Sequence, residues 1–267
     1  MNQKQYEQRE PREVRKLIRE GIITCPTTGM CRGYAQGNLV VLERELAWDF
    51  LLFCQRNPRA CPLLEVSEPG SRTFPGFAPG SDIARDIPKY RVYENGACTG
   101  VYEDVASYFE TPGCNLVSFL IGCSFSFEAD LIEAGIPVRQ IEEGVNVPMY
   151  NTNIPCVGAG VFSGNMVVSM RPIPYELVTA AVTVTAGMPR VHGAPIHIGY
   201  PELIGIDDIT SPDYGDPVTI RRGEIPVFWP CGVTPQAVVM NSRPPLAITH
   251  APGHMFITDK KNAQLRL

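Results

Sequence analysis

The sequence predicts an α/β fold: a mixed, largely parallel sheet flanked by helices, with a smaller α+β second domain. Two segments, around Cys123 and around Cys231, have the pattern of a buried strand, a cysteine turn and a helix. After Gly135 the pattern changes, because long periodic runs become rare. We therefore expect a discontinuous α/β core domain and an inserted α+β domain. Their predicted limits are residues 1–136 and 223–267 for the core and residues 137–222 for the insertion.

The N-terminal part is predicted to contain helices that alternate with short strands. Residues 11–20 form a predicted helix with one apolar face and a glycine directly after it. Residues 43–56 form a second helix, because apolar side chains recur at helical spacing until Pro58. The further elements expected in this part are strands at 62–66, 90–93 and 115–121 and a short helix at 105–109.

A long polar loop is predicted from Thr24 to Asn38, between the first two helices. Long loops inside compact domains are often functional. Arg32 in this loop is a candidate substrate-binding residue, because a guanidinium group can hold a carboxylate with two hydrogen bonds. The alternative is an arginine that contacts only solvent.

The first cysteine turn carries several candidate site residues. Gly122 is expected to allow a sharp turn after the strand, so that Cys123, Ser124 and Ser126 lie between strand and helix. Glu128 follows in the first helical turn. Open α/β sheets bind ligands at such turns, and a helix N-terminus favours anions. The alternative is that Cys123 is a small buried residue and Ser126 a helix cap.

The second half of the chain is predicted to contain a β-α-β unit, with strands at 166–170 and 196–198 and a helix at 175–185. Arg171 ends the first of these strands, and His192 lies in the Gly/Pro-rich loop before the second. Four aspartates lie in residues 205–217. Their spacing fits turns better than a known cation-binding loop, so no metal site is predicted.

A second cysteine turn follows at residues 225–240. A strand at 227–229 leads into Cys231, and Thr234 is placed as the N-cap of a helix that continues through Met240. If both cysteine turns followed parallel strands of one sheet, their helix N-termini would lie at the same edge. The two turns would then frame one crevice suited to anions.

The last strand, at 246–249, leads into a turn that contains two histidines. His250 and His254 flank Pro252 and Gly253, and a further strand at 255–258 follows. A histidine at a strand end is a natural proton carrier near neutral pH. The alternative for each histidine is a hydrogen bond to nearby backbone.

Composition excludes several classes of partner. The chain has 267 residues, a net charge of −5 and no block of Lys and Arg, so we predict no nucleic-acid partner. No apolar run approaches the ~20 residues of a membrane-spanning helix, and residues 1–7 are polar, so we predict a cytoplasmic protein without membrane contact. The nine cysteines are an odd number without a Cys-x-x-Cys pair, which favours reduced thiols. No cofactor is predicted, and a homo-oligomer is compatible with the sequence.

Several blocks of sequence resemble a known family, the hydro-lyases that are grouped with the D-glutamate cyclases. The resemblance spans residues from near 20 to near 259, and its blocks are 57–62, 119–128, 146–150, 168–172, 192–195, 227–236 and 249–255. It implies an α/β core with a smaller α+β domain and a cytoplasmic carbon–oxygen lyase. It also implies a specific reaction, the cyclisation of D-glutamate to 5-oxo-D-proline with loss of water. It supplies no catalytic residues.

The leading hypothesis is a lyase that acts on a small amino or hydroxy acid. Such chemistry needs a base, an acid and groups that hold carboxylates. We expect His250 or His254 to transfer protons and Glu128 to be a second acid or base. The expected substrate-binding residues are Arg32, Ser124, Ser126, Arg171, His192, Cys231 and Thr234.

Two alternatives to the lyase are kept open. In an amidase-like hydrolase, Cys123 attacks a carbonyl group and a histidine is the base. In the other alternative, the protein binds a small carboxylate without catalysis.

Overall fold

Two antiparallel sheets form the framework of the protein. The computed structural model describes residues 3–266. Residues 1, 2 and 267, which were predicted to belong to the core domain, lie outside the described residues. The larger sheet has the order β2-β5-β1-β10-β3-β4, with β11 also paired to β1, and the smaller has the order β6-β7-β9-β8. The strands of the larger sheet are β1 (Tyr34–Glu43), β2 (Leu63–Val66), β3 (Tyr90–Glu94), β4 (Ala97–Tyr102), β5 (Leu116–Gly122), β10 (Leu246–His250) and β11 (Phe256–Lys261). Those of the smaller sheet are β6 (Met149–Pro155), β7 (Asn165–Pro174), β8 (His197–Ile198) and β9 (Glu224–Pro230).

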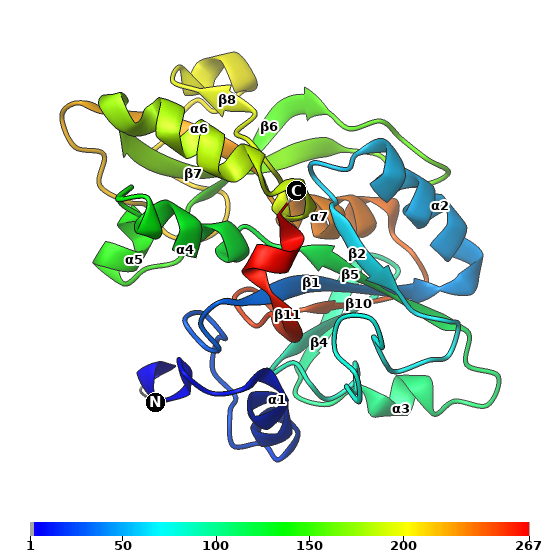
Figure 1. Ribbon diagram of the computed structural model, residues 1–267. Helices are drawn as coiled ribbons and strands as arrows, with labels where there is room; N and C mark the ends of the chain where they lie inside the picture. The colour runs from blue at the N-terminus through cyan, green and yellow to red at the C-terminus, as the bar shows by residue number, and fades with distance from the viewer. Residues whose placement is uncertain (1–2, 267) are drawn as a thin grey trace.

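Short helices surround these sheets (Figure 1). The α-helices are α1 (Pro11–Arg19), α2 (Arg44–Arg56), α3 (Ala106–Phe109), α4 (Phe125–Glu133), α5 (Arg139–Glu143), α6 (Val178–Ala186) and α7 (Val233–Ser242). The 3-10 helices are η1 (Gln3–Tyr6), η2 (Tyr175–Leu177), η3 (Pro189–Val191), η4 (Pro201–Ile204) and η5 (Asn262–Leu265). No helix within residues 3–266 is both long and apolar enough to cross a lipid bilayer.

The prediction of a largely parallel sheet is wrong. Every strand pair among the described residues is antiparallel, including the central pairs of β1 with β5 and with β10. The error has a physical cause. Every residue of β5 is buried, because both faces of the larger sheet are covered, and a strand covered on both faces has the continuous apolar sequence typical of parallel sheets.

Burial on both faces follows from the alternation of side chains along β1. Leu39 and Val41 belong to one large core cluster, whereas Val40 and Leu42 belong to the other. Both clusters also contain residues of the smaller sheet, such as Trp229 in the first. The two sheets therefore share their cores, and β9, which was expected within the core domain, pairs with β7 in the smaller sheet.

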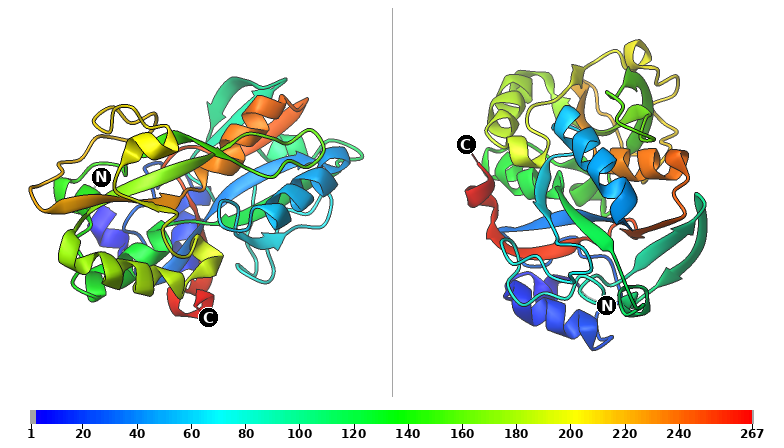
Figure 2. Two further views of the ribbon diagram at one scale, coloured as in Figure 1. Left: turned by 90° about the horizontal axis from the view of Figure 1, so that it is seen from above. Right: turned by 90° about the vertical axis from the view of Figure 1, so that its right-hand side faces the viewer.

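Helices pack at the junction of the two sheets. Figure 2 shows α2 and α7 on the same side of the larger sheet, and side chains of both contribute to the core cluster that contains Val40. Helix α4 lies beside α6 and also contacts β1. Through these contacts, α4 connects the larger sheet with the elements around the smaller one.

Most predicted helices are confirmed, but several other elements differ from the sequence prediction. Strand β1 begins at Tyr34, inside the segment predicted as a loop. Strand β4 and helix α5 were not predicted, because both are short and carry no clear apolar periodicity. Arg171, predicted at the end of its strand, lies within β7 and is completely buried.

Candidate active site

A cavity of about 790 Å³ lies where the larger sheet meets helices α4 and α5. Its walls come from the loop at residues 26–34, helix α4, helix α5 with the residues up to Val147, and the turn at Pro252 and Gly253. Thr27 holds two of these segments together, because its N–H donates to the carbonyl of Gly253 at 2.9 Å. The cavity is therefore built from segments that are far apart in the sequence.

Glu128 is the charged group of the buried wall of this cavity. It lies on α4, is 5% exposed and lines the cavity. Its Oε1 atom accepts a hydrogen bond from Gln140 Nε2 at 2.7 Å and forms an ion pair with the guanidinium of Arg171. Both described contacts use Oε1, so Oε2 is the oxygen left for a ligand.

Arg171 fixes this carboxylate from behind. Its side chain reaches from β7 and donates to the hydroxyls of Ser169 at 3.0 Å and Ser124 at 3.2 Å. The guanidinium also lies over the rings of Phe127 and Trp229, 5.0 and 5.5 Å from their centroids. A guanidinium stacked on aromatic rings and bonded to several oxygens is held in one orientation. Arg171 therefore holds Glu128 in place, although its Nε atom is buried without a described partner.

Three buried polar atoms in residues around Glu128 have no described partner. They are Nε of Arg171, the hydroxyl oxygen of Ser126 and the side-chain carbonyl oxygen Oε1 of Gln140, and the last two residues line the cavity. Leaving a buried polar atom unbonded costs roughly 1–3 kcal/mol.

The two cysteine turns lie close together, although their strands belong to different sheets. Asn38 of β1 lies between them: its Nδ2 donates to the carbonyl of Gly122 at 2.9 Å, and an added Cβ at Gly232 would lie 2.1 Å from the same nitrogen. Cys123 and Cys231 are both buried and do not line the cavity. Burial raises the pKa of Cys123 to about 12 and that of Cys231 to about 11, so both are thiols at neutral pH.

One ring nitrogen of each of the three predicted histidines contacts the backbone. His250 Nδ1 accepts a hydrogen bond from the Leu39 N–H at 3.1 Å, and burial lowers its pKa to about 4. His254 is half-buried, its Nδ1 lies 2.8 Å from the carbonyl oxygen of Pro252, and burial lowers its pKa. His192 Nδ1 lies 2.8 Å from the carbonyl oxygen of Arg59, and burial lowers its pKa to about 4. None of these three residues lines the cavity, although Pro252 and Gly253 beside His254 do.

The other predicted binding residues have different surroundings. Arg32 lines the cavity, is exposed, and forms an ion pair with Glu7 at 3.2 Å. Thr234 is completely buried, and its hydroxyl accepts from the Val167 N–H at 3.0 Å, which ties α7 to β7. Of all the predicted site residues, the structure places Arg32, Ser126 and Glu128 on the cavity wall, with Ser124 and Arg171 behind it.

Two residues with evident roles were missed by sequence reasoning. Gln140 lies on a helix of five residues, too short to give a periodic signal. Asn38 stands in a buried strand among apolar residues, and a polar residue in such a strand was a usable signal.

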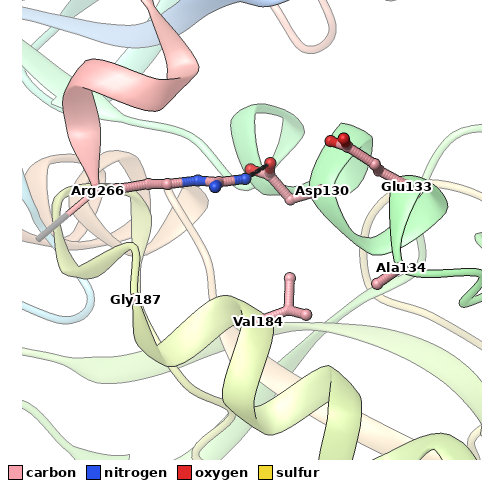
Figure 3. A pocket seen from close by; sticks show the side chains of 6 residues that line it. All are labelled: Asp130, Glu133, Ala134, Val184, Gly187 and Arg266. Atoms are coloured by element: carbon pink, nitrogen blue, oxygen red, sulfur yellow. Dashed lines mark hydrogen bonds and ion pairs between the residues drawn. The ribbon is translucent and has the colours of Figure 1, made fainter.

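A second cavity, of about 370 Å³, lies between α4, α6 and the C-terminal segment (Figure 3). The guanidinium of Arg266 reaches across to Asp130, with which it forms an ion pair. No predicted site residue lines this cavity. Within residues 3–266, no three His, Cys, Asp or Glu side chains are grouped so that they could hold a metal ion.

Comparison of the sequence with known proteins identifies the family of this chain. The family model of the D-glutamate cyclases matches residues 117–259. The chain belongs to the D-glutamate cyclase family. The region of this chain that the family model matches contains Glu128, Gln140 and Arg171. The family resemblance predicted from the sequence is thereby confirmed.

Relatives that match this chain over at least 95% of its residues carry hydro-lyase names. A "Putative hydro-lyase" of Clostridium beijerinckii is 63% identical over 261 residues, which cover 98% of each chain. A "Putative hydro-lyase GK2103" of Geobacillus kaustophilus is 60% identical over 95% of both chains, and a "Putative hydro-lyase" of Stutzerimonas stutzeri is 56% identical over 99% of both chains. A solved structure, that of a nitrogen repressor-like protein from Methanococcus jannaschii, covers 85% of this chain and 88% of its own. Its TM-score is 0.36 at 9% identity, a similarity too low to support any argument.

Proposed function

We propose that this protein is a carbon–oxygen lyase that acts on a small carboxylate or amino acid in the 790 Å³ cavity. The specific reaction proposed is the cyclisation of D-glutamate to 5-oxo-D-proline with loss of water. The observation that carries the proposal is the Glu128 carboxylate, which is buried in the cavity wall with one oxygen fixed by Arg171 and Gln140. Membership of the D-glutamate cyclase family and the hydro-lyase names of the relatives support it.

The proposed cyclisation needs one group that moves protons. The substrate ammonium gives a proton to Glu128, and the resulting amine attacks the carbon of the side-chain carboxylate. A carbon–nitrogen bond forms and a carbon–oxygen bond breaks. The departing oxygen takes one proton back from Glu128 and a second from the nitrogen, so it leaves as water. General acid–base catalysis of this kind contributes about 10²- to 10⁴-fold to the rate.

Arg32 is proposed to hold a substrate carboxylate. It is the only Lys or Arg among the described residues that line the cavity, since Arg171 lies behind Glu128. Its present partner, Glu7, lies on the same rim, and a carboxylate ligand would take the place of that surface ion pair. An exposed ion pair contributes about 0–1 kcal/mol, so this exchange costs little.

Incubation of the purified protein with D-glutamate tests the proposed reaction. We expect 5-oxo-D-proline to accumulate, measured by chiral chromatography, and L-glutamate is the matched stereochemical control. The reverse reaction, from 5-oxo-D-proline, is followed in the same assay. A protein that neither converts nor binds D-glutamate or 5-oxo-D-proline would contradict the specific substrate.

The site favours the lyase over a cysteine-dependent amidase. A cysteine nucleophile acts as a thiolate and must reach the substrate. Burial raises the pKa of Cys123 to about 12, and its side chain does not line the cavity. A non-catalytic carboxylate binder is the second candidate, because a cavity lined by Arg32 and Glu128 suits such a ligand with or without turnover. Thermal stabilisation by D-glutamate without any product would favour that candidate.

We also propose a cytoplasmic location. All nine cysteines are free, including the exposed Cys98, and free thiols are typical of a reducing compartment. Fractionation of cells that produce the protein, with detection by an antibody, tests this location.

A further inference from the structure

We propose that the cavity takes an amino acid with an apolar substituent on its amine, and that Ile132, Ile141 and Val145 bind this substituent. The inference rests on the proposed function and deepens it, because it names the class of substrate for the same cavity. The observation that carries it is a group of three exposed aliphatic side chains in the wall that also contains Glu128.

The cavity is larger than glutamate requires. Its volume is about 790 Å³. Protein cavities of about 300–1,000 Å³ hold drug-sized ligands, which are much larger than glutamate. A substrate with an additional substituent therefore has room that glutamate alone leaves unfilled.

Helix α4 turns a largely apolar stripe towards this cavity. The residues of the stripe that line the cavity are Phe125, Glu128, Ala129 and Ile132. Their spacing of three, four and seven residues places them on one face of the helix. A separate stripe of the same helix, with Phe127 and Leu131, is buried in the core. The cavity-facing stripe is therefore not needed to attach α4 to the protein.

Helix α5 and the residues after it supply the other apolar side of the wall. Ile141 and Val145 line the cavity and are 48% and 37% exposed, and Ile132 on α4 is 46% exposed. The start of α5 lies beside Glu128, because Gln140 Nε2 donates to Glu128 Oε1 at 2.7 Å. A single exposed apolar side chain is ordinary, but several along one cavity are typical of a ligand-binding surface.

The proposed reaction determines where the substituent lies. The substrate amine gives its proton to Glu128, so it lies beside this carboxylate. Ile132 is one helical turn further on the same face, about 6 Å along the axis, so a short aliphatic group on the nitrogen reaches it. A secondary amine also suits the reaction, because its ammonium form carries two N–H protons. Both leave with one carboxylate oxygen as water while the carbon–nitrogen bond forms, and the product is an N-substituted 5-oxo-D-proline.

Binding of a homologous series tests the inference. Calorimetric titration compares N-methyl-, N-ethyl-, N-propyl- and N-butyl-D-glutamate, which share both carboxylates and the charged amine. We expect the affinity of the wild-type protein to rise by about 2- to 4-fold with each added methylene, because complete burial of one methylene corresponds to about 4-fold. Chromatography of the same mixtures shows whether the N-substituted 5-oxo-D-proline is formed.

Two double variants separate the apolar contact from folding. In the double variant Ile132→Asn and Ile141→Asn, we expect the gain per methylene to fall below about 1.5-fold, because both helices lose their apolar contact with the substituent. Both positions are exposed, so we expect the melting temperature to change by less than about 3 °C. The matched control is Ile22→Asn with Ile220→Asn, at positions that are 46% and 36% exposed and outside the cavity wall. We expect this control to keep the wild-type gain.

The outcomes distinguish the inference from the proposed function. If the wild-type protein converts D-glutamate but binds the methyl and butyl derivatives equally, or the double variant in the wall keeps the full gain, the inference is overturned while the lyase proposal stands. If the gain is present in the wild-type protein and lost in that variant, but neither D-glutamate nor any derivative is converted, the binding site stands and the lyase proposal is overturned. If light scattering shows a wild-type dimer that the same variant dissociates, the aliphatic side chains form a subunit interface, and the inference is overturned.

Discussion

Glu128 of α4 and Arg171 of β7 form an ion pair that is almost completely buried, with side chains 6% and 0% exposed. Breaking a buried ion pair by removing one partner is strongly destabilising, because the remaining charge stays in a medium of low polarity. Glu128 nevertheless keeps one carboxylate oxygen towards a cavity. The pair therefore joins the elements around the two sheets and places a carboxylate in the cavity wall.

Replacement of this carboxylate is expected to abolish turnover. Glu128→Gln has the same shape but cannot take a proton, so we expect 5-oxo-D-proline formation to fall by about 10²-fold or more. Arg171 loses its charged partner, and we expect the free energy of unfolding to fall by up to about 3–5 kcal/mol. Activity is measured at a temperature where circular dichroism shows the variant to be folded. Glu133→Gln, on the exposed side of the same helix, is the matched control, and equal activities of the two variants would contradict the role of Glu128.

The cysteine at the first turn is expected to be dispensable for catalysis. Cys123 is buried, and burial raises its pKa to about 12, so its thiol is neutral and shielded. We expect Cys123→Ala to keep activity within about 3-fold and to lose roughly 1 kcal/mol of stability, as for other small truncations in a core. The rate of product formation and a urea titration measure both effects. A folded variant without activity would revive the amidase alternative.

Gly122 is expected to tolerate no side chain, because another segment contacts it closely. An added Cβ would lie 2.1 Å from the carbonyl oxygen of Arg190, in the 3-10 helix η3 directly before His192. We expect Gly122→Ala to lose about 3 kcal/mol or more, since a backbone segment must move. At Gly187, the nearest atom to an added Cβ is 3.6 Å away, and we expect Gly187→Ala to change stability by about 0.5 kcal/mol at most. Chemical denaturation compares the two variants, and similar losses would show that the close approach is not the cause.

Stability is expected to fall as the pH falls from about 6.5 to about 4. Burial lowers the pKa of His192 and of His250 to about 4, below the usual value near 6.5 that applies to the unfolded chain. Between these values the unfolded state binds more protons than the folded state, so acid favours unfolding. Their contribution is complete above about pH 6.5 and lost below about pH 4, and each histidine accounts for up to about 3 kcal/mol.

Urea titrations at several pH values between 4 and 7.5 measure this effect. His250→Asn keeps an acceptor for the Leu39 N–H but does not titrate, so we expect a flatter pH dependence than in the wild-type protein. His197→Asn, at a partly exposed position, is the control. Parallel pH curves for the wild-type protein and His250→Asn would be inconsistent with the lowered pKa of His250.

Local sequence patterns predicted the elements of the fold better than their arrangement. Helices α1, α2 and α4 were predicted from apolar periodicity and from the glycine and proline residues at their ends. The direction of the strands could not be predicted in the same way. A strand such as β5 has the same apolar sequence in a parallel or an antiparallel sheet if both of its faces are covered.

The candidate site was predicted only in part, because a local sequence pattern does not show which distant segments the fold brings together. Ser126 and Glu128 were found because a strand-to-helix turn can be recognised within ten residues of sequence. Gln140 was not found, because its role depends on a contact with Glu128 that only the folded chain creates. The two cysteine turns do lie together, yet Asn38 joins them across two sheets rather than along one sheet edge.

The sequence by itself determined the family, most of the helices and strands, and the segment that carries Glu128. These properties depend on residue order within short stretches, which is visible without a structure. Only the tertiary structure decided that the strands are antiparallel, that Cys123, Cys231 and His250 are buried away from the cavity, and that Arg171 and Gln140 hold Glu128. Each of these properties depends on which side chains the packed sheets bring together. Burial then keeps the two cysteines and His250 neutral near pH 7 and decides which side chains hydrogen-bond to one another.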